Sequence, residues 1–344
     1  MTGAREAPES VLVYVGLDLV GDGLMKLPFV RALRNACPDA RIVWLAGKGH
    51  STYGGVLAPL VDGLIDEVVD DAGVGQGWDE LLRPPLAGTA LAGQRFDLVV
   101  DTQRRVKTTL LLRRIPHRLF VSGAADYWLS DRRPPRGHRR PAAMIRQMLD
   151  LLEIATGRQA DPTVTRAIDP AAEALAETLL GDGRSFVGLA PGAGGRRKCW
   201  PLDRFLELGR RAADRGRTPV FLLGPGEAEW VDAVRTALPQ ALLPLQDPRA
   251  GAMAGSPLLT IAVAGRLDAA VANDSGGGHM LAAADIPLLS LFGPTPPAKF
   301  APFVSRGTIV RAQDFGGTEM DAIPVDAVDA ALETLLTAAC PGRR

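Results

Sequence analysis

The chain has 344 residues, 47% hydrophobic and 23% charged, which is typical of a folded globular protein long enough for two domains. Its 39 Lys and Arg residues balance 39 Asp and Glu residues, so net charge gives no attraction to nucleic acid. Three scattered cysteines argue against a disulfide framework and a zinc site. Residues 1–10 are polar and argue against a secretory signal, and no apolar run approaches the roughly 20 residues of a transmembrane helix. These features predict a cytoplasmic protein.

Short apolar segments alternate with helical patterns through the N-terminal half. The predicted strands are Val11–Val15, Arg41–Ala46, Glu67–Val69, Asp97–Asp101 and Arg118–Val121. The predicted helices are Leu24–Ala36, Gly54–Leu60, Trp78–Leu86, Arg105–Arg113 and a longer amphipathic helix near 140–156. This alternation predicts a parallel sheet with helices on both faces.

A carboxylate stands in the first strand-to-helix turn, Val15–Phe29. The turn lacks the G-x-G-x-x-G spacing of a dinucleotide-binding motif, and no acidic residue is placed where such a motif would use one. Both features argue against a dinucleotide site. Asp22 follows Gly21 near the predicted helix start, where a carboxylate is an ordinary cap. A role in catalysis is the alternative, and Asp18 is a secondary candidate.

Two basic tracts also lie in the N-terminal half. One combines Arg104, Arg105 and Lys107 with Arg113-Arg114, and the other, 132–140, reads RRPPRGHRR and includes Arg136. They could recognise a phosphorylated, anionic lipid, rest on an anionic membrane surface or simply be solvated. Nucleic acid is a poorer interpretation, because aromatic residues are sparse among the basic ones.

The strand and helix pattern restarts after a linker at Gly157–Pro170. Predicted strands are Phe186–Ala190, Pro219–Leu223, Leu242–Leu245, Ala269–Ala272 and Pro287–Leu291. Predicted helices are Pro170–Leu180, Leu202–Arg215, Glu227–Ala237, Leu258–Gly265, an Ala-rich helix from Gly276, and Val325–Ala339. We therefore expect two Rossmann-like domains, 1–160 and 161–323, followed by a C-terminal helix and tail, 324–344.

A glycine-rich loop, Ala190–Pro201, follows the first strand of the second domain. Gly194 and Gly195 allow backbone N–H groups to surround a phosphate, and Lys198 supplies a positive charge. Trp200 is predicted to pack beneath the loop, and neighbouring cations are predicted to favour the thiolate of Cys199. A basic solvated loop is the alternative.

The stretch Val271–Thr295 combines a strand, a polar turn, three glycines and a helix. Glycines at a helix N-terminus let a phosphate approach free N–H groups and the positive end of the helix dipole. On charge grounds Asp274 cannot bind phosphate, so it holds the turn, caps the helix or accepts a hydrogen bond from a sugar hydroxyl. A glycine-rich cap without a ligand is the alternative.

These motifs resemble the heptosyltransferases, glycosyltransferase family 9. The likeness spans about residues 11–305 and is carried by the Gly-Asp pair of the first turn with Pro28, by Lys-x-Trp-Pro at 198–201, and by D-S-G-x-x-H, A-A-A and F-G-P-T in 274–295. The sequence departs from the family pattern at Gly277-Gly278, where a bulkier residue is usual.

The resemblance implies a GT-B fold, two Rossmann-like domains with a cleft between them. It implies inverting, metal-independent transfer of a heptose from ADP-heptose to a lipopolysaccharide-core-like acceptor, an anionic glycolipid at the inner membrane surface, with no resident cofactor. Asp22 becomes the candidate base. The donor would contact Gly194, Gly195, Lys198, Glu227, Asp274, Ser275, Gly276 and His279, and the acceptor would contact Arg104, Arg105, Lys107 and Arg136.

Other functions remain open on the same architecture. A nucleotide-sugar epimerase would act without an acceptor, and a non-catalytic paralogue would keep only the nucleotide pocket. The acceptor could also be a protein rather than a lipid.

Overall fold

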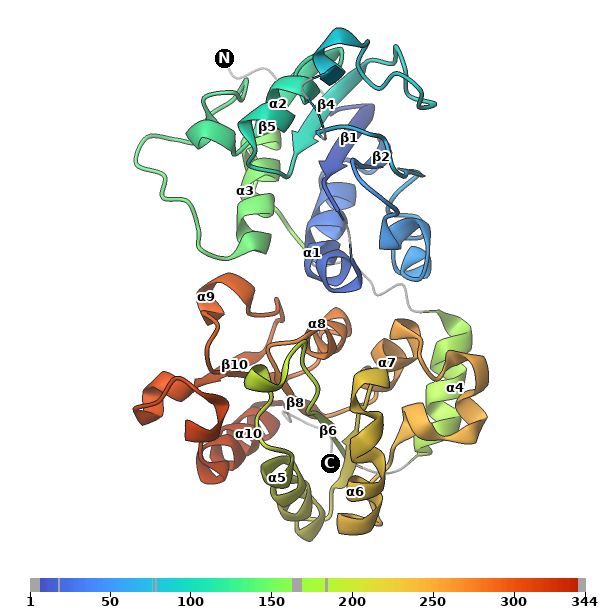
Figure 1. The fold of residues 1–344 in the computed structure, drawn as a ribbon, viewed down its shortest axis with the longest axis vertical. Coiled ribbons are helices and arrows are strands. Elements are labelled where there is room, and N and C mark those ends of the chain that lie inside the picture. The colour runs from blue at the N-terminus through green and yellow to red at the C-terminus, as the bar shows by residue number, and fades with distance from the viewer. Residues whose placement is uncertain are drawn as a thin grey trace. The chain divides into compact units, whose positions relative to one another are not determined.

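The computed structural model describes residues 7–17, 19–75, 77, 79–162, 169–182 and 185–339. Asp18, Trp78, residues 1–6 and residues 163–168 of the predicted linker lie outside the described residues. The chain divides into two compact units, Met1–Ala167 and Ile168–Arg344 (Figure 1). Each unit has its own sheet and its own hydrophobic core.

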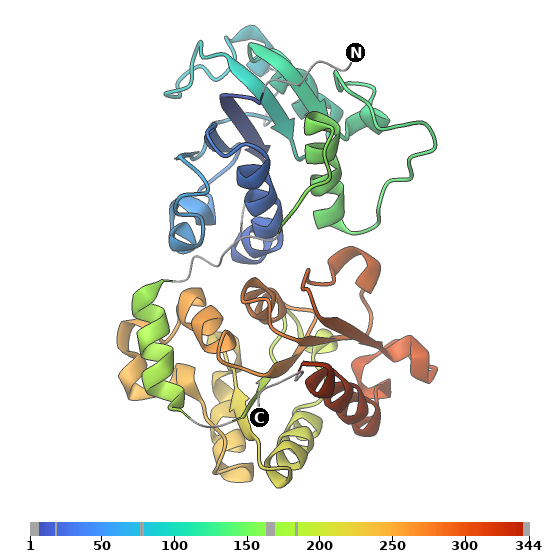
Figure 2. The same cartoon turned by 180° about the vertical axis from the view of Figure 1, so that it is seen from behind.

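The N-terminal unit contains a parallel sheet of five strands in the order β3-β2-β1-β4-β5. The central strands are continuous apolar runs, because both faces of the sheet are covered (Figures 1 and 2). The elements are β1 (Ser10–Val15), α1 (Val20–Ala36), β2 (Arg41–Ala46), β3 (Glu67–Val69), β4 (Phe96–Asp101), α2 (Val106–Leu112), β5 (His117–Ser122) and α3 (Met144–Thr156).

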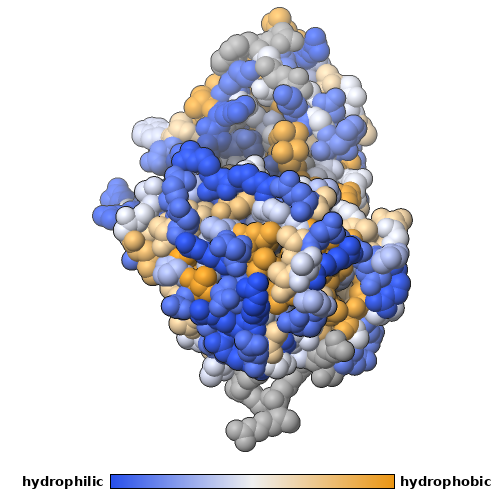
Figure 3. Space-filling model, turned by 60° about the horizontal axis from the view of Figure 1, so that its bottom comes forward, coloured by the Kyte–Doolittle hydropathy of each residue, from blue (hydrophilic) through white to orange (hydrophobic). Residues whose placement is uncertain are grey.

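The C-terminal unit contains a second five-stranded parallel sheet in the order β10-β9-β8-β6-β7. Hydrophilic residues predominate on the face that Figure 3 brings forward, with apolar residues between them. The strands are β6 (Phe186–Ala190), β7 (Thr218–Phe221), β8 (Ala269–Asn273), β9 (Leu288–Phe292) and β10 (Gly307–Arg311). The helices are α4 (Pro170–Leu180), α5 (Leu202–Asp214), α6 (Val231–Ala237), α7 (Pro257–Ala264), α8 (Gly276–Ala283), α9 (Pro297–Phe300) and α10 (Val325–Ala339).

Helix α10 completes the core of the C-terminal unit. Its buried residues Val328, Leu332, Leu335 and Leu336 join the same cluster as the strand residues. On its polar side Asp329 accepts from both ends of the Arg215 guanidinium, at 2.7 and 2.8 Å. Side-chain packing and a bidentate ion pair therefore both tie α10 to α5.

Three predicted elements are wrong. The segment Gly54–Leu60 forms only 3-10 turns, because Gly54-Gly55 and Pro59 interrupt it, and the described part of Trp78–Leu86 holds one such turn before Pro84-Pro85. The predicted strand Leu242–Leu245 is a single bridge between Val220 and Leu242, followed at Pro244 by another turn. Strand β10 was not predicted; it lies at the edge of the sheet and buries only Val310.

Candidate functional site

The predicted donor residues lie at the carboxyl end of the C-terminal sheet. Strands β6 and β8 are neighbours, and the strand order continues from β6 to β7 on one side and from β8 to β9 and β10 on the other. Such a reversal leaves a crevice between the loops that follow the two strands, and ligands of open α/β sheets bind there. The loop after β6 carries Lys198 and the turn after β8 carries Asp274, so both residues lie at this switch point.

In the loop after β6, Gly194 and Gly195 are exposed, and no protein atom lies within 4 Å of where a side chain would begin. Gly195 has an extended backbone, with φ of −178°, which any residue adopts. Neither packing nor backbone conformation therefore requires glycine here, whereas a ligand lying against the main chain would. The predicted burial of Trp200 is confirmed: its ring packs on Phe205, and its Nε1–H donates to the Ile323 carbonyl at 2.9 Å.

The turn after β8 begins helix α8. Ser275 is its N-cap, and the Ser275 Oγ accepts from the backbone N–H of Gly278 at 3.2 Å. Gly276 is exposed beside open space, so the first N–H groups of α8 remain accessible to an anion. His279 is half-buried one turn further along.

Asp274 holds the turn rather than capping the helix. Its Oδ2 accepts from the Lys198 ammonium at 2.8 Å and from the Thr295 hydroxyl at 2.7 Å. The Asp274 side chain is 9% exposed and that of Lys198 is 36% exposed, so the carboxylate orients an ammonium that still reaches solvent. An ammonium has three N–H donors, and the bond to Asp274 occupies one of them.

Sequence reasoning missed Asn273, which ties the two loops together. Its side chain is buried, donates to the Pro191 carbonyl at 2.7 Å and accepts from the Trp200 backbone N–H at 3.1 Å. An Asn at the end of a strand gives no signal of partners 82 and 73 residues away. Asn273 is therefore a positioning residue for the glycine-rich loop.

Glu227 caps its own turn and also faces the pocket. Its Oε2 accepts from the Gly224 backbone N–H at 2.8 Å, which is an ordinary capping interaction. A Cβ on Gly192 would lie 2.4 Å from the Glu227 carboxyl group, so only glycine fits opposite it. The carboxylate thus lies against the start of the glycine-rich loop.

These loops enclose a pocket with about 740 Å³ of empty space, including its open mouth. One side is built from loop backbone and the Glu227 carboxylate, and the other from small and apolar residues. Residues lining the second side include Leu222, Leu245, Ala254, Gly255, Pro257 and Met280. Sequence reasoning missed this wall, because its apolar residues have the same pattern as core residues. A carboxylate beside an apolar wall suits a nucleoside, with ribose hydroxyls at one end and a base at the other.

At Cys199 burial outweighs the predicted effect of the neighbouring cations. Burial raises the pKa of the Cys199 thiol above its ordinary value, the nearby Glu227 carboxylate adds to the rise, and Arg196 only partly opposes it. The chain neighbours of Cys199 are cationic, but Arg196 and Arg197 pair with Glu229 and Glu319.

In the N-terminal unit, Asp22 lies in the first turn of α1 but is not its cap. The N-cap is Leu19, which makes no side-chain capping bond. Asp22 is half-buried, and among the described residues its carboxylate has no hydrogen-bond partner. A purely capping role therefore has no support in the local geometry.

A second pocket opens at the switch point of the N-terminal sheet, where β1 and β4 are neighbours. It holds about 590 Å³ of empty space, and methionines and Tyr127 line it beside cationic groups. Met25 and Lys26 of α1 belong to its lining and follow Asp22 by three and four residues, so all three lie on one helix face. The remaining lining residues include Thr102, Gln103, Arg104, Arg140, Met144 and Met148.

The four predicted acceptor residues are only partly brought together. Arg104 lines the pocket, Arg105 is exposed beside it as the N-cap of α2, and Lys107 is half-buried in the first turn of α2. Arg136 lies on the long loop between β5 and α3 and is exposed.

Buried Asp101 supports the loop that carries Arg104. Its Oδ1 accepts from the Gln103 backbone N–H at 2.8 Å, and its Oδ2 accepts from Thr109 at 2.6 Å and from Ser122 at 2.8 Å. Burial raises the pKa of Asp101 to about 6, and these hydrogen bonds limit the rise. The network therefore holds the backbone after β4, which carries Gln103 and Arg104 to the pocket.

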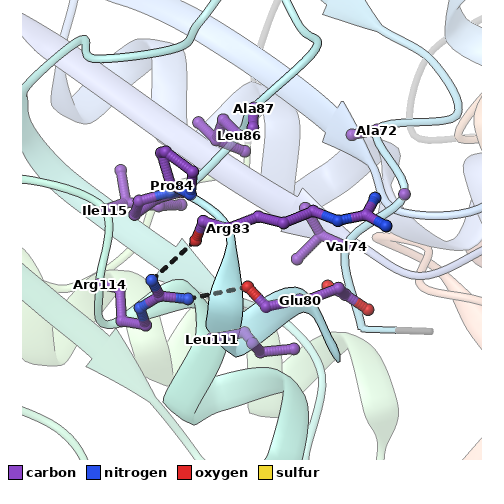
Figure 4. A pocket seen from close by; sticks show the side chains of 12 residues that line it. Ala72, Val74, Glu80, Arg83, Pro84, Leu86, Ala87, Leu111, Arg114 and Ile115 are labelled. Atoms are coloured by element: carbon purple, nitrogen blue, oxygen red, sulfur yellow. Dashed lines mark hydrogen bonds between the residues drawn. The ribbon is translucent and has the colours of Figure 1, made fainter. Parts of the chain in front are cut away.

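Arg113 and Arg114 of the first basic tract have structural partners. Arg114 donates to the carbonyls of Glu80 and Arg83, at 2.9 and 2.7 Å, and closes one side of a small pocket that contains none of the predicted site residues (Figure 4). Arg113 donates to the Leu129 carbonyl at 2.5 Å and to Asp131 at 2.9 Å. These two arginines hold loops in place.

In the described ranges no group of three or more His, Cys, Asp and Glu side chains is arranged to hold a metal ion. No helix of the described part of the chain is long and apolar enough to cross a bilayer.

Residues 87–321 match the model of glycosyltransferase family 9 (heptosyltransferase). Lipopolysaccharide heptosyltransferase 2 of Salmonella typhimurium is 25% identical over 316 residues, 87% of each chain. Lipooligosaccharide heptosyltransferase 2 of Haemophilus influenzae is 36% identical over a shorter stretch of 137 residues, 39% of this chain and 38% of that protein.

Solved structures share the architecture. A family 9 glycosyltransferase from Veillonella parvula superposes with a TM-score of 0.71 at 19% identity, over 96% of this chain and 97% of that one. An Escherichia coli heptosyltransferase solved with ADP gives a TM-score of 0.65 at 19% identity, over 95% and 99% of the two chains. The fold is therefore GT-B, as predicted.

Proposed function

The chain belongs to glycosyltransferase family 9, the heptosyltransferases, and on that premise we propose that it transfers a heptose from ADP-heptose to an anionic, lipopolysaccharide-core-like acceptor with inversion at the anomeric carbon. Relatives named as lipopolysaccharide heptosyltransferases support the acceptor class, and the relative solved with ADP supports the nucleotide.

The donor occupies the pocket of the C-terminal unit. Its nucleoside lies between Glu227 and the apolar wall, and its diphosphate lies on the glycine-rich loop and the N-terminus of α8. Lys198, oriented by Asp274, directs its remaining N–H donors at the diphosphate and stabilises the charge that develops as it leaves. Leaving-group stabilisation by an ammonium and helix N–H groups requires no divalent cation, so we expect metal-independent transfer.

The acceptor occupies the pocket of the N-terminal unit. Arg104 and Arg140 face an anionic sugar or phosphate there, and the exposed Arg105 lies beside them. Asp22, on the helix face that lines this pocket, removes the proton of the acceptor hydroxyl as that oxygen attacks the anomeric carbon.

One observation carries the proposal: Glu227 and Gly276 line one pocket, and the two loops that supply its backbone, after β6 and after β8, are joined by the Lys198–Asp274 ion pair. A merely solvated basic loop would not pair its lysine with a buried carboxylate 76 residues away beside a nucleoside-sized pocket.

A thermal-shift panel of ADP, UDP and GDP tests the donor site. Ligand at about 100 times its dissociation constant adds about 2.7 kcal/mol of stability, which raises the melting temperature of a unit this size by roughly 5–10 °C. We expect the largest shift with ADP. A larger shift with UDP or GDP would indicate a different donor nucleotide. No shift with any of the three would contradict the assignment of this pocket as the donor site.

An epimerase or a non-catalytic paralogue could use the same donor pocket. An epimerase would isomerise the sugar nucleotide without an acceptor, and a binding protein would leave it unchanged. The unpaired Asp22 carboxylate beside the second pocket favours transfer over both.

A further inference from the structure

The connection between β5 and α3 is an extended loop that leaves the body of the N-terminal unit (Figures 1 and 2). Both of its ends are fixed. Near the start, the Asp131 carboxylate accepts from the Phe120 backbone N–H at 2.7 Å, and the Asp131 backbone N–H donates to the Phe120 carbonyl at 2.9 Å. Near the end, Arg140 donates to the Gly123 carbonyl at 2.7 Å and stacks over Tyr127. Between these anchors His138 packs against Tyr127 and faces Asp150 of α3, so the loop is held in a fixed position on the unit.

The chain turns at the base of this loop through three left-handed residues, Ala125, Asp126 and Tyr127, with φ of 46°, 52° and 64°. Non-glycine residues rarely adopt this conformation, so surrounding contacts must impose it. Its result is that Tyr127 is buried while the next residue, Trp128, is 71% exposed. A tryptophan this exposed contributes little to the core.

Three arginines lie on the same loop as Trp128. Arg133 lies with its guanidinium carbon 4.4 Å from the centre of the Trp128 ring, and Arg133, Arg136 and Arg139 are all exposed. In the described part of the chain no carboxylate forms an ion pair with these three arginines. The loop thus presents the Trp128 ring and three unneutralised arginines, and Pro134 and Pro135 stiffen the segment that carries the arginines.

We propose that this loop docks the enzyme on an anionic lipid bilayer, with Trp128 in the interfacial region and the three arginines against lipid phosphates. Tryptophan favours the interface because its ring is apolar and its N–H is polar, and arginines near an anionic surface add electrostatic attraction. This surface belongs to the N-terminal unit and the donor pocket belongs to the C-terminal unit, and binding to lipid requires neither substrate.

Vesicle co-sedimentation of the full chain tests the proposal. Wild type should bind vesicles of phosphatidylglycerol and phosphatidylcholine and should not bind pure phosphatidylcholine. Arg133→Gln/Arg139→Gln should weaken binding by roughly 25-fold, because each arginine contributes about fivefold. Arg210→Gln/Arg235→Gln, an equal loss of charge on the exposed surface of the C-terminal unit, should bind as wild type does.

The position of Trp128 has its own readout. Brominated lipids should quench part of the tryptophan fluorescence of wild type, and Trp128→Phe should lose that part while keeping its melting temperature. Wild type that ignores anionic vesicles, a loop variant that binds like the control variant, or quenching that survives in Trp128→Phe would each overturn the proposal. None of these results would affect the donor-site assignment, which the nucleotide panel tests separately.

Discussion

Asp22→Asn should reduce turnover by about 10²–10⁴-fold, with nucleotide binding unchanged, because general base catalysis contributes on that order. A sugar hydroxyl has a pKa far above neutrality, so its proton must leave as the new bond forms. Asparagine keeps the shape of the side chain but cannot take the proton. Asp22 is not the cap of α1, so the substitution removes only the favourable interaction of a negative charge with the helix N-terminus. This loss lowers the free energy of unfolding by about 0.3–1 kcal/mol.

Steady-state transfer assays and thermal melts of the same preparations check this prediction. The melting temperature of Asp22→Asn should stay within about 4 °C of wild type. Asp18→Asn, a change of the neighbouring carboxylate that lies outside the described residues, is the control and should cost much less. Wild-type turnover by Asp22→Asn would mean that the base lies elsewhere.

Lys198→Met should weaken binding of ADP by about 10- to 100-fold and binding of adenosine far less. A hydrogen bond to a charged group contributes roughly 1.5–3 kcal/mol, and only ADP carries the diphosphate that the ammonium would contact. Methionine keeps most of the stem of the side chain, so the loop should retain its packing. Isothermal titration calorimetry with both ligands measures the difference.

Two further variants separate binding from folding in this experiment. Lys198→Met leaves the Asp274 carboxylate without its ion-pair partner, so Lys198→Met/Asp274→Asn removes the stranded charge and should restore stability but not ADP affinity. Arg197→Gln removes an adjacent charge that pairs with Glu319 and should leave ADP affinity unchanged. Equal losses for ADP and adenosine would contradict a diphosphate role for Lys198.

Much of the fold could be predicted from the sequence because parallel strands buried on both faces are continuous apolar runs. Val11–Val15 and Phe186–Ala190 are such runs, and the structure confirms both as strands. The failures fall where that signal weakens. Strand β10 lies at an edge and buries one residue, and Leu242–Leu245 is apolar but meets Pro244, which cannot donate a ladder hydrogen bond.

The site was predictable only where its chemistry is visible in residue type. Glycines, Lys198 and Asp274 stand out because a phosphate site needs backbone access and charge. The structure adds two features that depend on distant contacts: the bridge through Asn273 and the apolar wall from Leu245 to Met280. Apolar wall residues look like core residues until the fold shows that they face a cavity.

The most direct test of the function is to incubate the enzyme with ADP-heptose and a heptose-free lipopolysaccharide core, and then determine the mass and the anomeric configuration of the product by mass spectrometry and NMR. Inverting transfer predicts an acceptor heavier by one heptose, released ADP, and an anomeric configuration opposite to that of the donor. Sugar-nucleotide isomerisation without an acceptor, a product that retains the donor configuration, or no product under conditions where ADP-heptose binds would contradict it.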